Sequence, residues 1–165
     1  MSLVGFKAQN HEQQVLVHGP KDHVDDRATT PEDFAPLHER FAFTLDAAAS
    51  AANAKLPRYF TAEQDGLAQD WTGERVWCNP PYSKIAPWIL KASNGGAELV
   101  VMLLPANRTE QGWWQDHVEP YRDRPGGIRT EFLRGRMRFL RPGQKRIGAN
   151  ERPPFGCVLL IWGDS

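Results

Sequence analysis

The chain has 165 residues, of which 41% are hydrophobic and 24% charged, and its net charge is zero. This length suits a single domain and leaves no room for a separate substrate-binding domain, so substrate recognition must come from loops and insertions. No apolar run approaches the ~20 residues that span a bilayer, so no membrane role is indicated. Residues 1–14 lack the apolar core of a secretory signal. We therefore expect the protein to act in the cytoplasm.

The two cysteines and five histidines do not form a metal-binding pattern. Cys78 and Cys157 both lie in apolar, strand-like runs, which favours buried free thiols over a disulfide. The histidines are scattered, and no pair of them has metal-ligand spacing. We assign no metal site.

Residues 1–28 are polar and lack sustained periodicity, so we expect an irregular arm that precedes a single domain over residues 29–165. The domain opens with a helix-start pattern. Thr30 is placed as the N-cap and Pro31 at the first helical position, with acidic residues in the first turn. Three apolar residues then fit one helical face: Phe34, Leu37 and Phe41.

The next segment predicts a strand, an acid and a helix in succession. The strand covers Phe41–Leu45 and stops at Asp46. The alanine-rich run Ala47–Lys55 predicts a helix, because alanine has the highest helix propensity. Arg58–Thr61 is a candidate second strand, and Glu63–Gly66 is expected to form an acidic turn.

The centre of the chain alternates strands with helices. Arg75–Cys78 predicts a strand, and Ile85–Ala92 predicts a helix that ends at Asn94-Gly95-Gly96. The run Glu98–Leu104 is continuously apolar, which is typical of a strand covered on both faces.

Beyond it, Gln111–Val118 predicts a helix and Ile128–Leu133 a strand, with Gly135–Leu140 as a possible hairpin partner. Phe155–Trp162 predicts an apolar last strand. Strands that alternate with helices and then follow one another directly indicate an α/β fold. Its sheet is expected to be mostly parallel, with an antiparallel edge at the C-terminus.

The strand at Arg75–Cys78 runs into Asn79-Pro80-Pro81-Tyr82, a sequence typical of amino-group methyltransferases. The two prolines cannot continue a strand, so Asn79 is held at its carboxyl end, where ligands bind in open α/β sheets. Two acceptors on an amine, the Asn79 side-chain oxygen and the Pro80 carbonyl, favour a tetrahedral and more nucleophilic nitrogen. Tyr82 could stack on the base that carries the amine. The alternative is an ordinary strand exit.

Basic residues are concentrated near the C-terminus. Seven of them, opposed only by Glu151, lie in the stretch 134–152, which we interpret as a nucleic-acid-facing insertion that contacts phosphates. The alternative is an exposed hairpin with solvated charges. The basic residues are Arg134, Arg136, Arg138, Arg141, Lys145, Arg146 and Arg152.

A longer set of segments occurs in a characteristic order. These are Thr30-Pro31-Glu32, Leu45-Asp46-Ala47-Ala48-Ala49-Ser50, Tyr59-Phe60-Thr61, Asp65-Gly66-Leu67 with Trp71, Trp77-Cys78-Asn79-Pro80-Pro81-Tyr82-Ser83, Leu103-Leu104-Pro105-Ala106, and Gly135-Arg136 followed by Phe139. Together they resemble the phage-type, Dam-like DNA N6-adenine methyltransferases. The resemblance implies a Rossmann-like methyltransferase fold, S-adenosylmethionine as methyl donor, adenine flipped out of duplex DNA as acceptor, and a phage or prophage protein acting in a bacterial host.

The resemblance also implies roles for individual residues. Asn79, Pro80, Pro81 and Tyr82 would form the catalytic motif. The donor would be held by residues from four segments of the chain: Thr30, Pro31, Asp46, Ala47, Asp65 and Asn79. Glu63 is a second candidate for the donor site.

Each of these roles has a simpler alternative. Thr30 and Pro31 could only start a helix, Asp46 could only cap one, and Asp65 and Glu63 could be solvated turn residues. The chain also departs from the wider superfamily, since alanines replace the glycines of the donor-binding turn after Asp46. The distance in sequence from Asp46 to Asn79 is compressed, so we expect a strand or helix to be missing there.

Two other functions stay open on the sequence alone. One is a methyltransferase for RNA or for a protein glutamine amide, since the motif also serves those groups. The other is a catalytically inactive nucleic-acid-binding relative, for which the missing glycines are the best indication.

Overall fold

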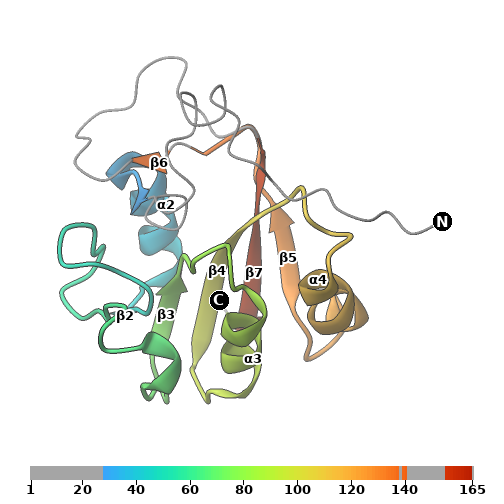
Figure 1. Cartoon of the computed structure of the whole chain (residues 1–165), viewed down its shortest axis with the longest axis horizontal. Helices are drawn as coiled ribbons and strands as arrows, with labels where there is room; N and C mark the ends of the chain where they lie inside the picture. The colour runs from blue at the N-terminus through green and yellow to red at the C-terminus, as the bar shows by residue number, and fades with distance from the viewer. Residues whose placement is uncertain (1–27, 138, 141–154, 165) are drawn as a thin grey trace, which may run out of the picture.

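The computed structural model describes residues 28–137, 139–140 and 155–164 (Figure 1). In chain order its elements are β1 (Ala28–Thr29), α2 (Pro31–Phe41), β2 (Leu45–Asp46), η2 (Gly66–Ala68), β3 (Arg75–Cys78), α3 (Ala86–Asn94), β4 (Leu99–Pro105), α4 (Gly112–His117), η3 (Glu119–Tyr121), β5 (Arg129–Phe132), β6 (Phe139–Leu140) and β7 (Cys157–Gly163). The irregular arm expected over residues 1–28 lies outside the described residues except for Ala28, which belongs to β1.

A five-stranded sheet in the order β2-β3-β4-β7-β5 forms the centre of the molecule. Strands β2, β3 and β4 are parallel, whereas β7 is antiparallel to both of its neighbours. The predicted α/β class is confirmed, but the last strand is not at the edge of the sheet; it lies between β4 and β5. Because β5 therefore runs parallel to β4, the carboxyl ends of β2, β3, β4 and β5 share one edge, called here the carboxyl edge.

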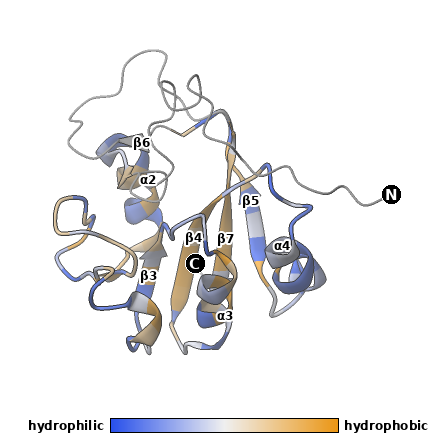
Figure 2. Cartoon of the chain, viewed as in Figure 1, coloured by the Kyte–Doolittle hydropathy of each residue, from blue (hydrophilic) through white to orange (hydrophobic). Residues whose placement is uncertain are grey.

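Alternate side chains of β4 enter two separate hydrophobic layers, as the period of a strand requires. Val100 and Met102 pack with side chains of α3 and α4 on one face, and Val101 and Leu103 pack with side chains of α2 on the other. All seven residues of β4 are buried, and Figure 2 shows β4 and β7 as largely hydrophobic strands. The prediction of a strand covered on both faces is confirmed.

Helix α2 begins and packs as predicted. The Thr30 hydroxyl accepts a hydrogen bond from the backbone N–H of Asp33 at 3.2 Å, which satisfies one of the free donors at the start of the helix. Phe34 and Phe41 are buried, and Leu37 packs against the same core cluster. The helix thus covers one face of the sheet and fixes the chain immediately after β1.

The helix predicted at Ala47–Lys55 is wrong, because this segment has no helical structure. The backbone N–H of Ala47 donates to the carbonyl of Trp77 at 3.0 Å, and that of Ala49 donates to the carbonyl of Phe60 at 2.9 Å. The alanines therefore bond to two neighbouring segments of the chain instead of to one another. Helix propensity is a weak preference that tertiary hydrogen bonds override.

Other predicted strands differ from the structure in their bounds or pairing. Phe41 ends α2, so the strand predicted at Phe41–Leu45 is reduced to the two residues of β2. The strand predicted at Arg58–Thr61 is present only as a single bridge between Asp46 and Tyr59. The connection from β2 to β3 contains no α-helix and only η2, in line with the expected missing element.

The hairpin predicted from Gly135–Leu140 is also wrong in its partner. Within this segment β6 pairs antiparallel with β1, with Thr29 opposite Phe139, and not with β5. The chain after β5 therefore returns to the N-terminal segment. A pairing between residues more than a hundred positions apart has no local signal in the sequence.

The strand at Arg75–Cys78 and the helices near Ile85–Ala92 and Gln111–Val118 are confirmed within a few residues. Both cysteines are buried free thiols, as predicted. Burial raises the pKa of the Cys157 thiol to about 12 and that of the Cys78 thiol well above its usual value. Neither is suited to act as a nucleophile.

Turn η2 packs directly on the chain that follows β2. A Cβ at the buried Gly66 would overlap the carbonyl oxygen of Ala47. The indole Nε1 of the fully buried Trp71 donates to the Gly66 carbonyl at 3.0 Å, and the Trp71 and Trp88 rings stack with centroids 6.2 Å apart. These contacts hold the irregular connection between β2 and β3 against α3.

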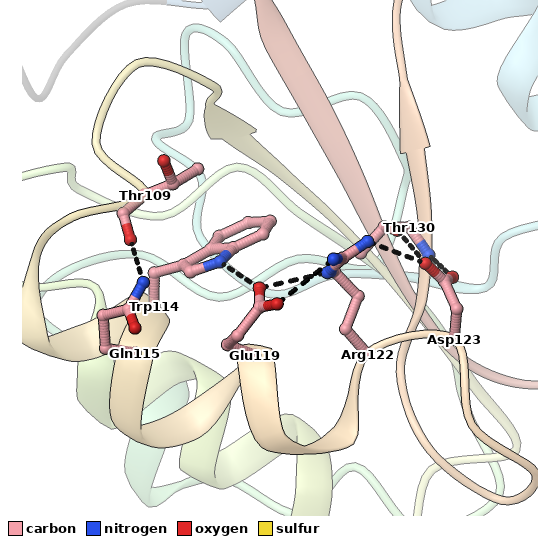
Figure 3. Close-up of polar contacts among 7 residues, drawn as sticks. All are labelled: Thr109, Trp114, Gln115, Glu119, Arg122, Asp123 and Thr130. Carbon is pink, nitrogen blue, oxygen red and sulfur yellow. Dashed lines mark hydrogen bonds and ion pairs between the residues drawn. The ribbon is translucent and has the colours of Figure 1, made fainter.

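A chain of polar contacts joins α4, η3 and β5 (Figure 3). The indole Nε1 of Trp114 donates to Glu119 at 2.8 Å, and Glu119 pairs with Arg122 at 3.1 Å. Asp123 accepts hydrogen bonds from both the backbone N–H and the hydroxyl of Thr130, at 2.9 and 2.7 Å. The turn before β5 is thereby fixed, which supports β5 as the edge strand of the sheet.

Among the described helices, none has the length and apolar composition that crossing a membrane requires.

Replacing Gly66 by alanine is expected to lower the free energy of unfolding by about 1–3 kcal/mol, because the added methyl group overlaps a backbone carbonyl that cannot turn aside. Urea denaturation measures the change. Gly112→Ala is the matched control: a Cβ there meets only the Asp116 side chain at 3.6 Å, and stability should be unchanged or slightly higher. Equal stability of the two variants would contradict the tight contact.

Candidate functional site

A cavity of about 480 Å³ lies at the carboxyl ends of β2 and β3. Its walls come from β1, from the ends of β2 and β3, from the connection between those strands, and from the start of α3. Four residues predicted at the donor site line this one cavity, although they come from separate segments of the chain: Asp46, Ala47, Asp65 and Asn79.

The carboxylate of Asp46 is buried at the end of β2, with 2% of the residue exposed. Its Oδ2 accepts a hydrogen bond from the backbone N–H of Lys55 at 2.9 Å. Within the described residues its Oδ1 is buried without a hydrogen-bond partner. Burial raises the pKa of Asp46, while the backbone N–H groups of Lys55 and Ala48 oppose this shift. An unpartnered buried acceptor in a cavity wall is costly unless a ligand supplies the donor.

Lys55 also lines the cavity, half-buried, and thus places a cation close to this carboxylate. Burial lowers the pKa of Lys55, and the negative charge of Asp46 raises it in part. The cavity therefore presents an anion and a cation in a sheltered setting. This arrangement suits a ligand that carries both charges.

Only one of the two candidate acids near η2 belongs to the cavity wall. Asp65 lines the cavity and Glu63 does not. Asp65 is the N-cap of η2, has a left-handed φ of 54°, and accepts a hydrogen bond from the backbone N–H of Leu67 at 3.2 Å. Asp is one of the few non-glycine residues that adopt this conformation readily. Its carboxylate is exposed at the rim of the cavity.

Asn79 follows β3 directly and lines the cavity together with Pro81. Its side-chain Nδ2 lies 3.5 Å from the hydroxyl oxygen of Thr29, a buried residue of β1 that lines the same cavity. Thr30 and Pro31 are not in the lining: Thr30 is buried as the N-cap of α2, and Pro31 is exposed at the first helical position. The N-terminal segment therefore reaches the cavity through Thr29, one residue before the predicted position.

Pro80 and Tyr82, the other members of the predicted catalytic motif, lie outside the cavity lining. The Tyr82 hydroxyl donates to the carbonyl of Leu103 at 3.3 Å, and burial raises its pKa well above the usual value. Its ring lies edge-on to Phe155, with centroids 6.2 Å apart. Arg108 donates to the Tyr82 carbonyl at 3.1 Å. Tyr82 is therefore fixed against the end of β4, outside the cavity wall that contains Asn79.

The predicted DNA-binding residues are described only in part. Arg134 and Arg136 are exposed and follow β5 at the carboxyl edge. They therefore lie at the same edge of the sheet as Asn79. The other five of this predicted set are outside the described residues: Arg138, Arg141, Lys145, Arg146 and Arg152.

Several residues in the cavity wall have no sequence signal that would select them for a site. Thr29 precedes Thr30 by one position, but Thr29 lines the cavity whereas Thr30 caps α2. Lys55 lies at the end of the segment predicted to be a helix, so its place in a cavity wall is not indicated by the sequence. Gly66 is predicted only to form a turn. Lys84 also lines the cavity, and because it follows Tyr82 by two positions its place near the site could be inferred from the sequence.

Comparison with known proteins identifies the family. The sequence model described as DNA N-6-adenine-methyltransferase (Dam) matches residues 18–164. A DNA N-6-adenine-methyltransferase of Haemophilus phage HP1 (strain HP1c1) is 38% identical over 74 residues, which cover 43% of each chain. One of Escherichia phage T1 is 34% identical over 93 residues, 53% of this chain and 39% of the relative. The chain thus spans about two fifths of the length of these curated relatives. It belongs to the DNA N-6-adenine-methyltransferase (Dam) family.

Proposed function

We propose that this chain transfers a methyl group from S-adenosylmethionine to the N6 amine of adenine in DNA. The observation that carries the proposal is the position of Asn79. It lies at the exit of β3, in the wall of a cavity that also contains a buried carboxylate. The family match supports DNA and adenine as the substrate class.

The cavity suits the methyl donor in size and in chemistry. Its volume of about 480 Å³ lies within the roughly 300–1,000 Å³ of small-molecule sites. Asp46 Oδ1 is the acceptor that needs a donor, and Asp65 adds a second carboxylate at the rim. The apolar side chains of Leu67, Trp77 and Trp88 provide walls suited to a purine ring. When bound, S-adenosylmethionine supplies an electrophilic methyl group on its sulfonium.

The chain's own part in the reaction is to orient and activate the adenine amine. That nitrogen is a poor nucleophile because its lone pair is conjugated into the ring. The Asn79 Oδ1 and the Pro80 carbonyl would accept hydrogen bonds from its two hydrogens and so favour a tetrahedral, more nucleophilic nitrogen. Neither group needs to act as a strong base. Tyr82, the last residue of the motif, would stack on the flipped base.

DNA would reach this site along the carboxyl edge. Arg134 and Arg136 are exposed at the end of β5, and strands β3 and β5 end at the same edge. Basic side chains there can contact phosphates on either side of a flipped base. Such contacts give affinity and orientation without reading the sequence.

Purified protein incubated with labelled donor and unmethylated DNA is expected to form N6-methyladenine, identified by nucleoside analysis. Asn79→Ala should lower turnover by roughly 10²–10³-fold, as loss of one stabilising group in an active site does, while the fold is retained. The control is Asn94→Ala, which removes an amide that donates to the Leu90 carbonyl at the far end of α3. Absence of N6-methyladenine across varied DNA, or full turnover in Asn79→Ala, would contradict the proposal.

Asp46→Asn is expected to weaken donor binding without lowering the stability of the fold. The pKa of Asp46 is raised by burial above its ordinary value of 3.8, so the folded protein holds this proton to higher pH than the unfolded chain. Stability is therefore lost as pH rises from about 4 through the raised pKa. Asparagine has no carboxyl group to ionise, so the variant does not lose stability in this way. It should unfold at an equal or higher urea concentration than wild type at pH 7, and the difference should be smaller near pH 4.

The same variant should bind the donor about 10–100-fold more weakly, since a hydrogen bond to a charged group contributes ~1.5–3 kcal/mol. Isothermal titration calorimetry with S-adenosylmethionine measures the affinity. Wild-type affinity in Asp46→Asn would show that the carboxylate has only a structural role.

Replacing Arg134 and Arg136 together by glutamine should weaken DNA binding and reduce the slope of log affinity against log salt by about 2, at ~0.9 per phosphate contact. Donor affinity should not change. Arg124→Gln is the matched control, because Arg124 is exposed in the turn before β5, at the opposite edge of the sheet. An unchanged salt slope in the double variant, measured by fluorescence anisotropy, would place the DNA surface elsewhere.

A further inference from the structure

Thr29 is the residue of β1 that reaches the candidate site. It is 1% exposed, lines the cavity, and is held on its backbone by pairing with Phe139 of β6. The next residue, Thr30, uses its hydroxyl to cap α2. Two adjacent threonines therefore have different tasks, and the hydroxyl of Thr29 is directed to Asn79.

The contact joins the Thr29 Oγ1 to the Asn79 Nδ2 at 3.5 Å. This is long for a hydrogen bond, as is common for catalytic contacts before the substrate is bound, and we expect it to shorten in the complex. A buried hydroxyl gains stability only from a polar partner. The partner that the described residues offer to Thr29 is the amide of Asn79.

The orientation of this amide decides what it can do. One end of an asparagine side chain donates hydrogen bonds and the other accepts them. An amine that must become more nucleophilic needs the accepting end. In the contact seen here the Thr29 hydroxyl accepts from Nδ2, so Oδ1 is the end of the amide that can accept from the substrate amine.

We propose that Thr29 is a positioning residue: its hydroxyl orients Asn79 so that Oδ1, not Nδ2, faces the target amine. This role rests on the proposed methyl transfer and deepens it. Thr29 does not touch the reacting atoms. It acts through Asn79 and links the pairing of β1 with β6 to the exit of β3.

Thr29→Val tests the role, because valine keeps the volume and branching of threonine and removes only the hydroxyl. Turnover at saturating donor and DNA should fall by about 10–100-fold, the loss that a misplaced reacting group causes. Donor affinity by calorimetry should fall by a much smaller factor than turnover. Thr29→Ser, which keeps the hydroxyl, should recover most of the lost turnover.

Thr44→Val is the matched control. The Thr44 hydroxyl accepts from the backbone N–H of Arg75 at 2.9 Å and donates to Glu74 at 2.6 Å, at the amino end of β3. Its loss should reduce stability with no change in turnover. A side-chain readout separates orientation from folding: the Asn79 amide proton resonances in ¹⁵N-edited NMR should shift in Thr29→Val and stay in place in Thr44→Val.

Three results would overturn the role of Thr29. They are full turnover in Thr29→Val, loss of donor affinity by the same factor as turnover, and no recovery in Thr29→Ser. A wild-type protein that methylates no DNA would instead overturn the proposed function. In that case the NMR comparison still tests the contact, and unshifted Asn79 resonances in Thr29→Val would exclude it.

Discussion

The close contact between Gly66 and the carbonyl of Ala47 is the constraint on which the site depends. The connection from β2 to β3 has no α-helix, so its shape must come from specific contacts. Trp71 fixes the Gly66 carbonyl from the buried side, and Asp65 takes a left-handed conformation to start the turn. This part of the cavity wall is therefore formed by packing against the chain after β2, and the packing places Asp65, whereas Asp46 is placed by β2 itself.

The position of β7 determines what gathers at the carboxyl edge. A last strand inserted antiparallel between β4 and β5 makes β5 parallel to β4. The residues that follow β5 thus emerge on the same side of the sheet as the motif that follows β3. Burial of β4 and β7 on both faces, at ~1.5–3 kcal/mol for each large apolar side chain, makes this pair of strands the rigid base of the arrangement.

Sequence patterns predicted the elements whose signals are local. The apolar run of β4 and the Thr30 cap of α2 have such signals, and both are confirmed. The helix at Ala47–Lys55 failed because alanine preference is smaller than the hydrogen bonds these residues make to Trp77 and Phe60. Thr29 and Lys55 could not be selected for the site, because their roles depend on contacts with residues distant in sequence.

The structure explains why alanine is sufficient at the positions that follow Asp46. A glycine-rich turn lets a backbone approach a ligand or another segment closely, because it carries no side chains. In this chain the backbone N–H groups of Ala47 and Ala49 are already bonded to other segments, so those positions need no unusual conformation. The close approach occurs across the cavity wall, at Gly66. At this contact only glycine fits, in the segment that packs on the chain after β2, whereas none of the alanines that follow Asp46 has a left-handed φ.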